Sequence, residues 1–91
     1  MKQTLEQIDL IRLMIDANRK YFGLALNVDD VGDVFRSKRL ACLIGVEGLH
    51  QIGHSFSVLR TYQSLGVRYI TLTHTKTNDY ADACVSRFRA I

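Results

Sequence analysis

Four side chains that can bind metal ions or move protons lie between residues 47 and 74: Glu47, His50, His54 and His74. A carboxylate can serve as a metal ligand, act as a general base or pair with a loop arginine. An imidazole can bind a metal ion, hold an anionic group of a substrate or transfer a proton. For each of them the structural alternative is a hydrogen-bonded residue that orders a loop. The residue types leave these roles open, and the positions of the side chains must decide among them.

Glu47 and His74 each stand directly after a segment with the pattern of a β-strand. Residues 40–46 form a continuous apolar run without alternation, which is typical of a strand covered on both faces in a parallel sheet. Residues 67–73 are rich in β-branched and aromatic side chains and predict a second strand. Between them, residues 55–65 have helical spacing, with Ser55 as the N-cap and Gly66 as the stop.

This strand–helix–strand order predicts a right-handed βαβ unit with parallel strands. The carboxyl ends of both strands then lie on the same edge of the sheet. We therefore expect Glu47 and His74 to open onto one rim, and parallel α/β folds build their active sites on such a rim.

His50 and His54 are four residues apart, a spacing that can place two metal ligands on one helical face. Gly53 lies between them and the expected helix cap, Ser55, follows directly. This context favours residues of a loop or helix start that line the same rim as Glu47, rather than a metal pair.

The upstream sequence predicts two more helices and one more strand. A helix is expected to begin at a capping box formed by Thr4 and Gln7 and to stop at Gly23. Residues 23–27 are a short strand candidate, and Asn27 is expected to cap a helix that contains Asp29 and Asp30 in its first turn. The expected fold class is α/β, with about three parallel strands alternating with helices.

Composition narrows the function further. The chain has 91 residues, of which 47% are hydrophobic and 23% are charged, which suits one small globular domain. The formal charge is +3, but the basic residues are scattered and lack interleaved aromatic residues, so we expect no nucleic-acid partner. No apolar run approaches the roughly 20 residues of a membrane span. The two cysteines have neither a disulfide framework nor metal-site spacing.

The stretches "LIGVEGLHQIG", "SVLRTYQSLGVRYITLTH" and "YAD" resemble the membrane (renal) dipeptidase family of zinc metallopeptidases. That family has a pattern of the type GVEGGH, then LR-x-x-x-x-LGxRYxTLTH, then a short loop ending in AD, and the match is most specific from Leu43 to His74. The resemblance implies a (β/α)₈ TIM barrel. Residues 1–91 would be an incomplete middle portion of that dipeptidase-like domain.

The resemblance also implies a chemistry and partners. Members hydrolyse dipeptides at a two-zinc centre, in which Glu47 would be the metal ligand that bridges both Zn²⁺ ions and His74 would contact the substrate. The full-length parent would be a homodimer, and its localisation stays open. The family's HxD ligand pair and its later metal-binding histidines are not found in these 91 residues. We therefore expect the chain by itself to be inactive. The alternatives are a non-catalytic dipeptidase-like scaffold and a small ligand-binding α/β domain.

Three positions depart from the family pattern. Leu49 stands where the second glycine of GVEGGH is expected. In the loop after TLTH, which is often SCNTPWAD-like, this chain has "TKTNDYAD", so that Lys76 replaces the cysteine and Asp79 replaces the proline. The resemblance therefore implies that a family disulfide using that cysteine cannot form here.

Overall fold

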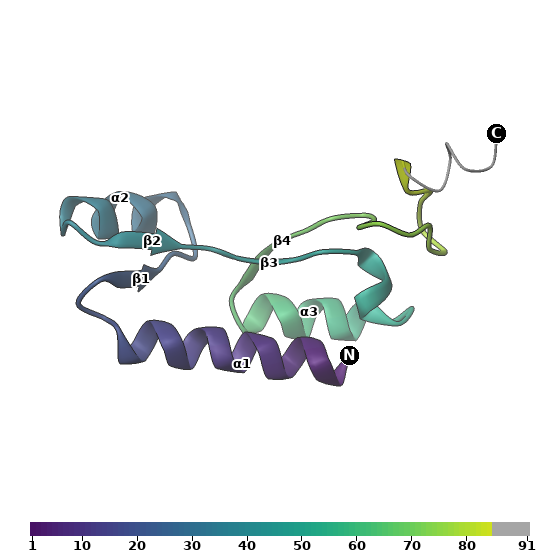
Figure 1. Cartoon of the computed structure of the whole chain (residues 1–91), viewed down its shortest axis with the longest axis horizontal. Helices are drawn as coiled ribbons and strands as arrows, with labels where there is room; N and C mark the ends of the chain where they lie inside the picture. Colours follow the sequence, from purple (N-terminus) through teal and green to yellow (C-terminus); the bar gives the residue numbers. More distant parts are fainter. Residues whose placement is uncertain (85–91) are drawn as a thin grey trace.

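Helices and short parallel strands alternate along the chain, which confirms the α/β class (Figure 1). The computed structural model describes residues 1–84. The elements are α1 (Lys2–Ala17), β1 (Phe22–Leu24), α2 (Val28–Arg36), β2 (Leu40–Cys42), β3 (Ile44–Val46), the 3₁₀ helix η1 (Leu49–Ile52), α3 (Phe56–Ser64) and β4 (Val67–Ile70). Within the described part of the chain, no helix has both the length and the apolar character needed to cross a membrane.

The strands form two parallel pairs, β1 with β2 and β3 with β4. The single strand expected over residues 40–46 is therefore divided at Leu43: its first half pairs with β1 and its second half with β4. Figure 1 shows β2 and β3 following one another, with a different partner beside each. The division arises because β1 soon leaves the sheet to enter α2, while β4 pairs only from Ile44 onward. The parallel orientation is as predicted, whereas residues 1–84 form open sheets and the barrel remains an expectation.

The first helix differs from the prediction at both ends. α1 begins at Lys2, and the expected capping residue Thr4 lies inside the helix, where its hydroxyl donates a hydrogen bond of 2.6 Å to Gln51 Oε1. The predicted capping box is therefore wrong, because the Thr4 hydroxyl bonds to Gln51 instead of to the backbone of its own helix. The helix ends at Ala17 rather than near Gly23. Gly23 lies in β1, where a Cβ atom would collide with Val34 of α2.

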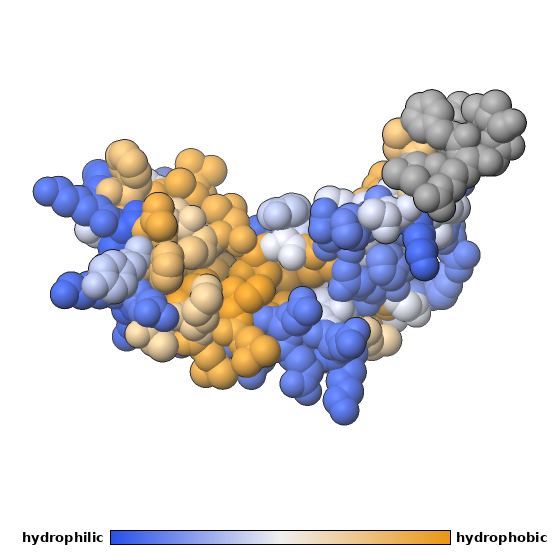
Figure 2. Space-filling model, in the orientation of Figure 1, coloured by the Kyte–Doolittle hydropathy of each residue, from blue (hydrophilic) through white to orange (hydrophobic). Residues whose placement is uncertain are grey.

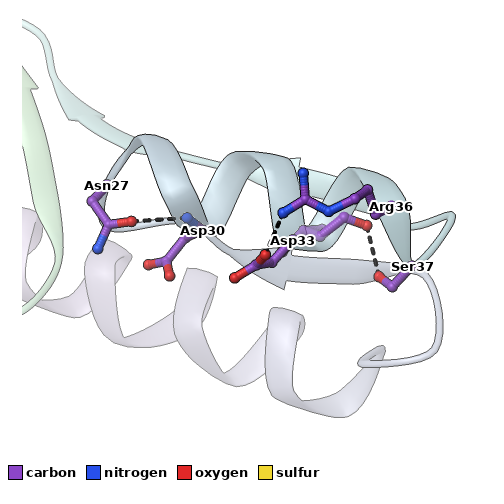
Figure 3. A network of polar contacts seen from close by, with 6 residues as sticks. Asn27, Asp30, Asp33, Arg36 and Ser37 are labelled. Atoms are coloured by element: carbon purple, nitrogen blue, oxygen red, sulfur yellow. Dashed lines mark hydrogen bonds and ion pairs between the residues drawn. The ribbon is translucent and has the colours of Figure 1, made fainter.

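The predicted N-caps of α2 and α3 are confirmed. Asn27 accepts a hydrogen bond from the backbone N–H of Asp30, and Figure 3 shows this cap at the start of α2. An Arg36–Asp33 ion pair of 2.6 Å lies further along the same helix. Ser55 accepts from the backbone N–H of Val58 at the start of α3. Both caps satisfy donors that a helix leaves unpaired in its first turn.

The core lies between the β3–β4 pair and the helices α1 and α3. Its buried side chains are Ile8, Ile44, Val46, Ile52, Tyr62 and Val67. Only one face of β3 is buried, since Ile44 and Val46 point into the core while Gly45 is exposed. The prediction of a strand covered on both faces is therefore wrong for the β3 part of residues 40–46, whose second face is exposed at Gly45. Leu40 and Leu43 are left 66% and 52% exposed.

Many large apolar side chains remain exposed, and Figure 2 shows apolar surface extending from the α2 end to the middle of the molecule. They include Leu10, Leu13, Phe35, Leu40, Leu43, Phe56 and Leu72. Large exposed apolar areas and unpaired strand edges favour association. We expect the 91-residue chain to form oligomers whose size rises with concentration in analytical ultracentrifugation. A monodisperse monomer with a sharp cooperative melt would contradict this.

Candidate functional site

Glu47 and His74 meet at the carboxyl ends of β3 and β4, as predicted. Glu47 directly follows β3, whereas the strand predicted over residues 67–73 ends at Ile70, so that His74 lies four residues after β4. His74 Nε2 is 3.5 Å from Glu47 Oε2, and the two side chains are 55% and 63% exposed. An exposed pair of this kind contributes at most about 1 kcal/mol to stability. Folding therefore does not depend on their contact, and both groups stay accessible to a ligand.

Backbone and threonine hydrogen bonds fix the segment that carries Glu47. The backbone N–H of Gly48 donates to Thr71 Oγ1 at 2.8 Å, and the N–H of Thr71 donates to the carbonyl of Val46 at 3.0 Å. The N–H of Leu49 donates to the carbonyl of Leu72 at 3.2 Å. Gly48 has φ +100°, and the His50 ring occupies the place of a Cβ. A glycine is therefore required directly after Glu47.

Thr71 was missed as a positioning residue by the sequence analysis, and its replacement is a test of this arrangement. Thr71→Val removes the acceptor of the buried Gly48 N–H, so we expect the free energy of unfolding to fall by about 1–3 kcal/mol. Urea denaturation measures the change. Thr61→Val is the matched control, because the Thr61 hydroxyl only donates to Ser57 of its own exposed helix turn and its loss should stay within about 0.5 kcal/mol. Equal effects of both variants would contradict the role of Thr71.

Gln51 connects the segment around Glu47 to the helices α1 and α3. The sequence analysis also missed this role of Gln51. Its side-chain amide donates to the carbonyl of Glu47 and its Oε1 accepts from Thr4 of α1. Its own carbonyl accepts a 2.7 Å hydrogen bond from the hydroxyl of Tyr62, which is fully buried on α3. A buried tyrosine usually finds a hydrogen-bond partner. An expectation that Tyr62 is buried was the only feature of the sequence that could have pointed to its bond with Gln51. The main chain at Glu47 is thus held from three elements.

His50 and His54 have separate partners. His50 lies in η1 and lines a pocket together with His74. His54, which has a left-handed backbone at φ +63°, places Nε2 2.8 Å from Asp79 Oδ2 and its ring centroid 5.7 Å from that of Tyr80. The prediction that these histidines line the rim agrees with the position of His50, whereas His54 braces the loop after β4.

The pocket beside His74 has a volume of about 300 Å³. It is lined by His50, His74, Thr75, Lys76, Thr77 and Asn78. A more apolar pocket of about 270 Å³ lies between α3 and β4 and includes neither Glu47 nor His74 in its lining. The rim pocket therefore has imidazole, hydroxyl and ammonium groups in its lining, and the Glu47 carboxylate lies 3.5 Å from His74 Nε2 beside it.

The described residues bring two ligand-type side chains together at the rim, Glu47 and His74, which is fewer than a whole metal site needs. Within residues 1–84, no three His, Cys, Asp or Glu side chains come together in a way that could hold a metal ion. Catalytic zinc sites usually have three protein ligands. Glu47 suits one position of such a site, because its carboxylate is exposed and its backbone is fixed.

Comparisons with known proteins match this chain over nearly its whole length. The family described as membrane dipeptidase (peptidase family M19) matches residues 1–90. Dipeptidase ataJ of Aspergillus terreus is 54% identical over 87 residues, which are 96% of this chain and 21% of that protein. Dipeptidase verJ of Clonostachys rogersoniana is 52% identical over 83 residues, and Dipeptidase 3 of Mus musculus is 45% identical over 89 residues, or 17% of its length.

The chain thus spans about a fifth of the length of the curated relatives that it matches. The match over residues 1–90 includes both rim residues, Glu47 and His74, and every described helix and strand. The chain belongs to the membrane dipeptidase family, peptidase family M19.

Proposed function

We propose that this chain forms part of a zinc-dependent dipeptidase, in which Glu47 is a metal ligand and His74 contacts the dipeptide. The observation that carries the proposal is the 3.5 Å approach of Glu47 and His74 at the ends of adjacent parallel strands, in a chain that matches a dipeptidase family. When bound, a pair of zinc ions would acidify a water molecule and polarise the scissile carbonyl.

The chain's own residues have two tasks in this proposal. Glu47 presents two carboxylate oxygens at a fixed place, since Gln51 holds its carbonyl and Gly48 is bonded to Thr71. His74 presents an exposed imidazole next to it, which can hydrogen-bond a polar group of the dipeptide. Holding the reacting groups in a fixed geometry lowers the barrier that a free encounter would have to overcome.

We further propose that residues 1–91 are one part of a (β/α)₈ dipeptidase barrel. The parallel strands and their covering helices are what a segment of such a barrel requires. A single carboxylate at the rim falls short of a catalytic zinc site, so the other ligands would come from outside the described residues.

A chimera tests the proposal. In Dipeptidase ataJ, the matching segment is replaced by residues 1–84 of this chain, and hydrolysis of Ala-Ala is measured with zinc supplied, alongside the unaltered relative and the 91-residue chain alone. We expect turnover by the chimera and none by the 91-residue chain. A chimera that folds and binds zinc but leaves every dipeptide intact, while the unaltered relative is active, would refute the proposed function.

A further inference from the structure

The rim pocket has one cationic side chain in its lining, Lys76, and the Glu47 carboxylate lies 3.5 Å from the lining residue His74. Its six lining residues contain one ammonium group, Lys76, and two imidazoles, His50 and His74, but no carboxylate. Lys76 is exposed and forms no ion pair with any acidic side chain within residues 1–84. A lysine without an acidic partner among the described residues can interact with a negatively charged ligand.

The loop that carries Lys76 has a defined shape. Asn78 Oδ1 accepts from the backbone N–H groups of Tyr80 and Ala81 at 2.8 and 3.2 Å, and its Nδ2 donates to the carbonyl of Leu72 at 2.8 Å. The His54–Asp79 pair ties the same loop to the segment that precedes α3. The loop after Lys76 is therefore held mainly by the hydrogen bonds of Asn78.

Lys76 and Asp79 are two of the positions that depart from the dipeptidase pattern, and they make different contributions to this loop. Asp79 forms an exposed pair with His54, which contributes little to stability, whereas Lys76 adds a positive charge to the pocket. Every dipeptide has a terminal carboxylate, and an acidic dipeptide has a second carboxylate in its side chain. The added charge is thus suited to a second negative group on the substrate.

We propose that the rim pocket binds the acidic side chain of a dipeptide, with Lys76 as its charge partner. This inference rests on the proposed dipeptidase function. A pocket of about 300 Å³ has room for an aspartate or glutamate side chain, and the Thr75 hydroxyl and the His50 imidazole in its lining can donate hydrogen bonds to the carboxylate oxygens. Lys76 is then a specificity-determining residue.

The test compares substrates that differ only in charge. In the chimera with residues 1–84, kcat/KM is measured for Ala-Asp against Ala-Asn and for Asp-Ala against Asn-Ala. We expect either Ala-Asp or Asp-Ala to be preferred over its amide counterpart by about fivefold, a modest factor because the site is open to solvent. Lys76→Gln should abolish this preference by raising KM for the acidic dipeptide. The preference should also fall as salt is raised. Lys20→Gln, an exposed lysine outside the pocket lining, is the matched control and should leave the preference intact.

The outcomes separate this inference from the proposed function. An active chimera whose acidic preference is absent or survives Lys76→Gln refutes the pocket, while the dipeptidase function stands. An equal loss for charged and neutral substrates also refutes it, because Lys76 would then act structurally. If no dipeptide is hydrolysed, the 91-residue chain is titrated by NMR with N-acetylaspartate and N-acetylasparagine. Shifts at residues 74–78 that are larger for N-acetylaspartate and are lost in Lys76→Gln support the pocket, and equal or absent shifts overturn it.

Discussion

Glu47→Gln in the chimera is expected to lower kcat/KM for Ala-Ala by about a thousandfold. The amide keeps the shape of the side chain but removes the negative charge that the proposed zinc pair would share. Loss of an interaction worth about 4 kcal/mol in the transition state corresponds to this factor. Because the Glu47 carboxylate is 63% exposed and its 3.5 Å contact with His74 is weak, the fold should be unaffected.

Glu6→Gln is the matched control, since Glu6 is an exposed carboxylate on α1 and should leave turnover unchanged. Zinc content, measured by mass spectrometry after dialysis, gives a readout besides activity and should fall only for Glu47→Gln. Full activity and full zinc content in Glu47→Gln would remove Glu47 from the proposed centre. Loss of activity with a changed circular-dichroism spectrum would assign Glu47 a structural role instead.

Tyr62→Ala is expected to lower the free energy of unfolding by about 3–5 kcal/mol, the range typical of deleting a large aromatic side chain from a core. Tyr62 is fully buried against the core beneath β3 and β4, and its hydroxyl holds the Gln51 carbonyl. Small domains are stable by only about 5–15 kcal/mol, so this loss is a large share of the total. Urea denaturation followed by circular dichroism measures it.

Two tyrosine variants separate packing from hydrogen bonding. Tyr62→Phe keeps the ring and removes only the bond to Gln51, so we expect a loss of about 1 kcal/mol. Tyr21→Ala, at a position that is 61% exposed, should change stability by no more than about 0.5 kcal/mol. If Tyr62→Ala were as mild as Tyr21→Ala, the described core would not be what stabilises this chain.

The alternation of helices and strands, and the meeting of Glu47 and His74 at one sheet edge, could be predicted because they depend on local sequence features. Side-chain oxygens at Asn27 and Ser55 identify helix starts, and Gly66 marks the end of α3 at φ +111°. The order of strand, helix and strand then requires a parallel crossover, and this placed Glu47 and His74 on one edge.

The errors fell where a distant partner overrode a local pattern. Thr4 matches a capping box, yet its hydroxyl bonds to Gln51, which is 47 residues away in sequence. Gly23 resembles a helix stop, but it lies in β1, where Val34 of α2 leaves no room for a side chain. The apolar run over residues 40–46 was predicted as one strand, and two different neighbours divide it.

The sequence by itself determined the α/β class, the parallel direction of the strands and the nearness of Glu47 to His74, because hydrophobic period, caps and crossover handedness suffice for these. Only the tertiary structure decided how the site is held. The hydrogen bond from Thr4 to Gln51, the bond from Gly48 to Thr71 and the His54–Asp79 pair each join residues far apart in the chain. Such contacts depend on where folding brings the backbone, which residue type and spacing alone do not encode.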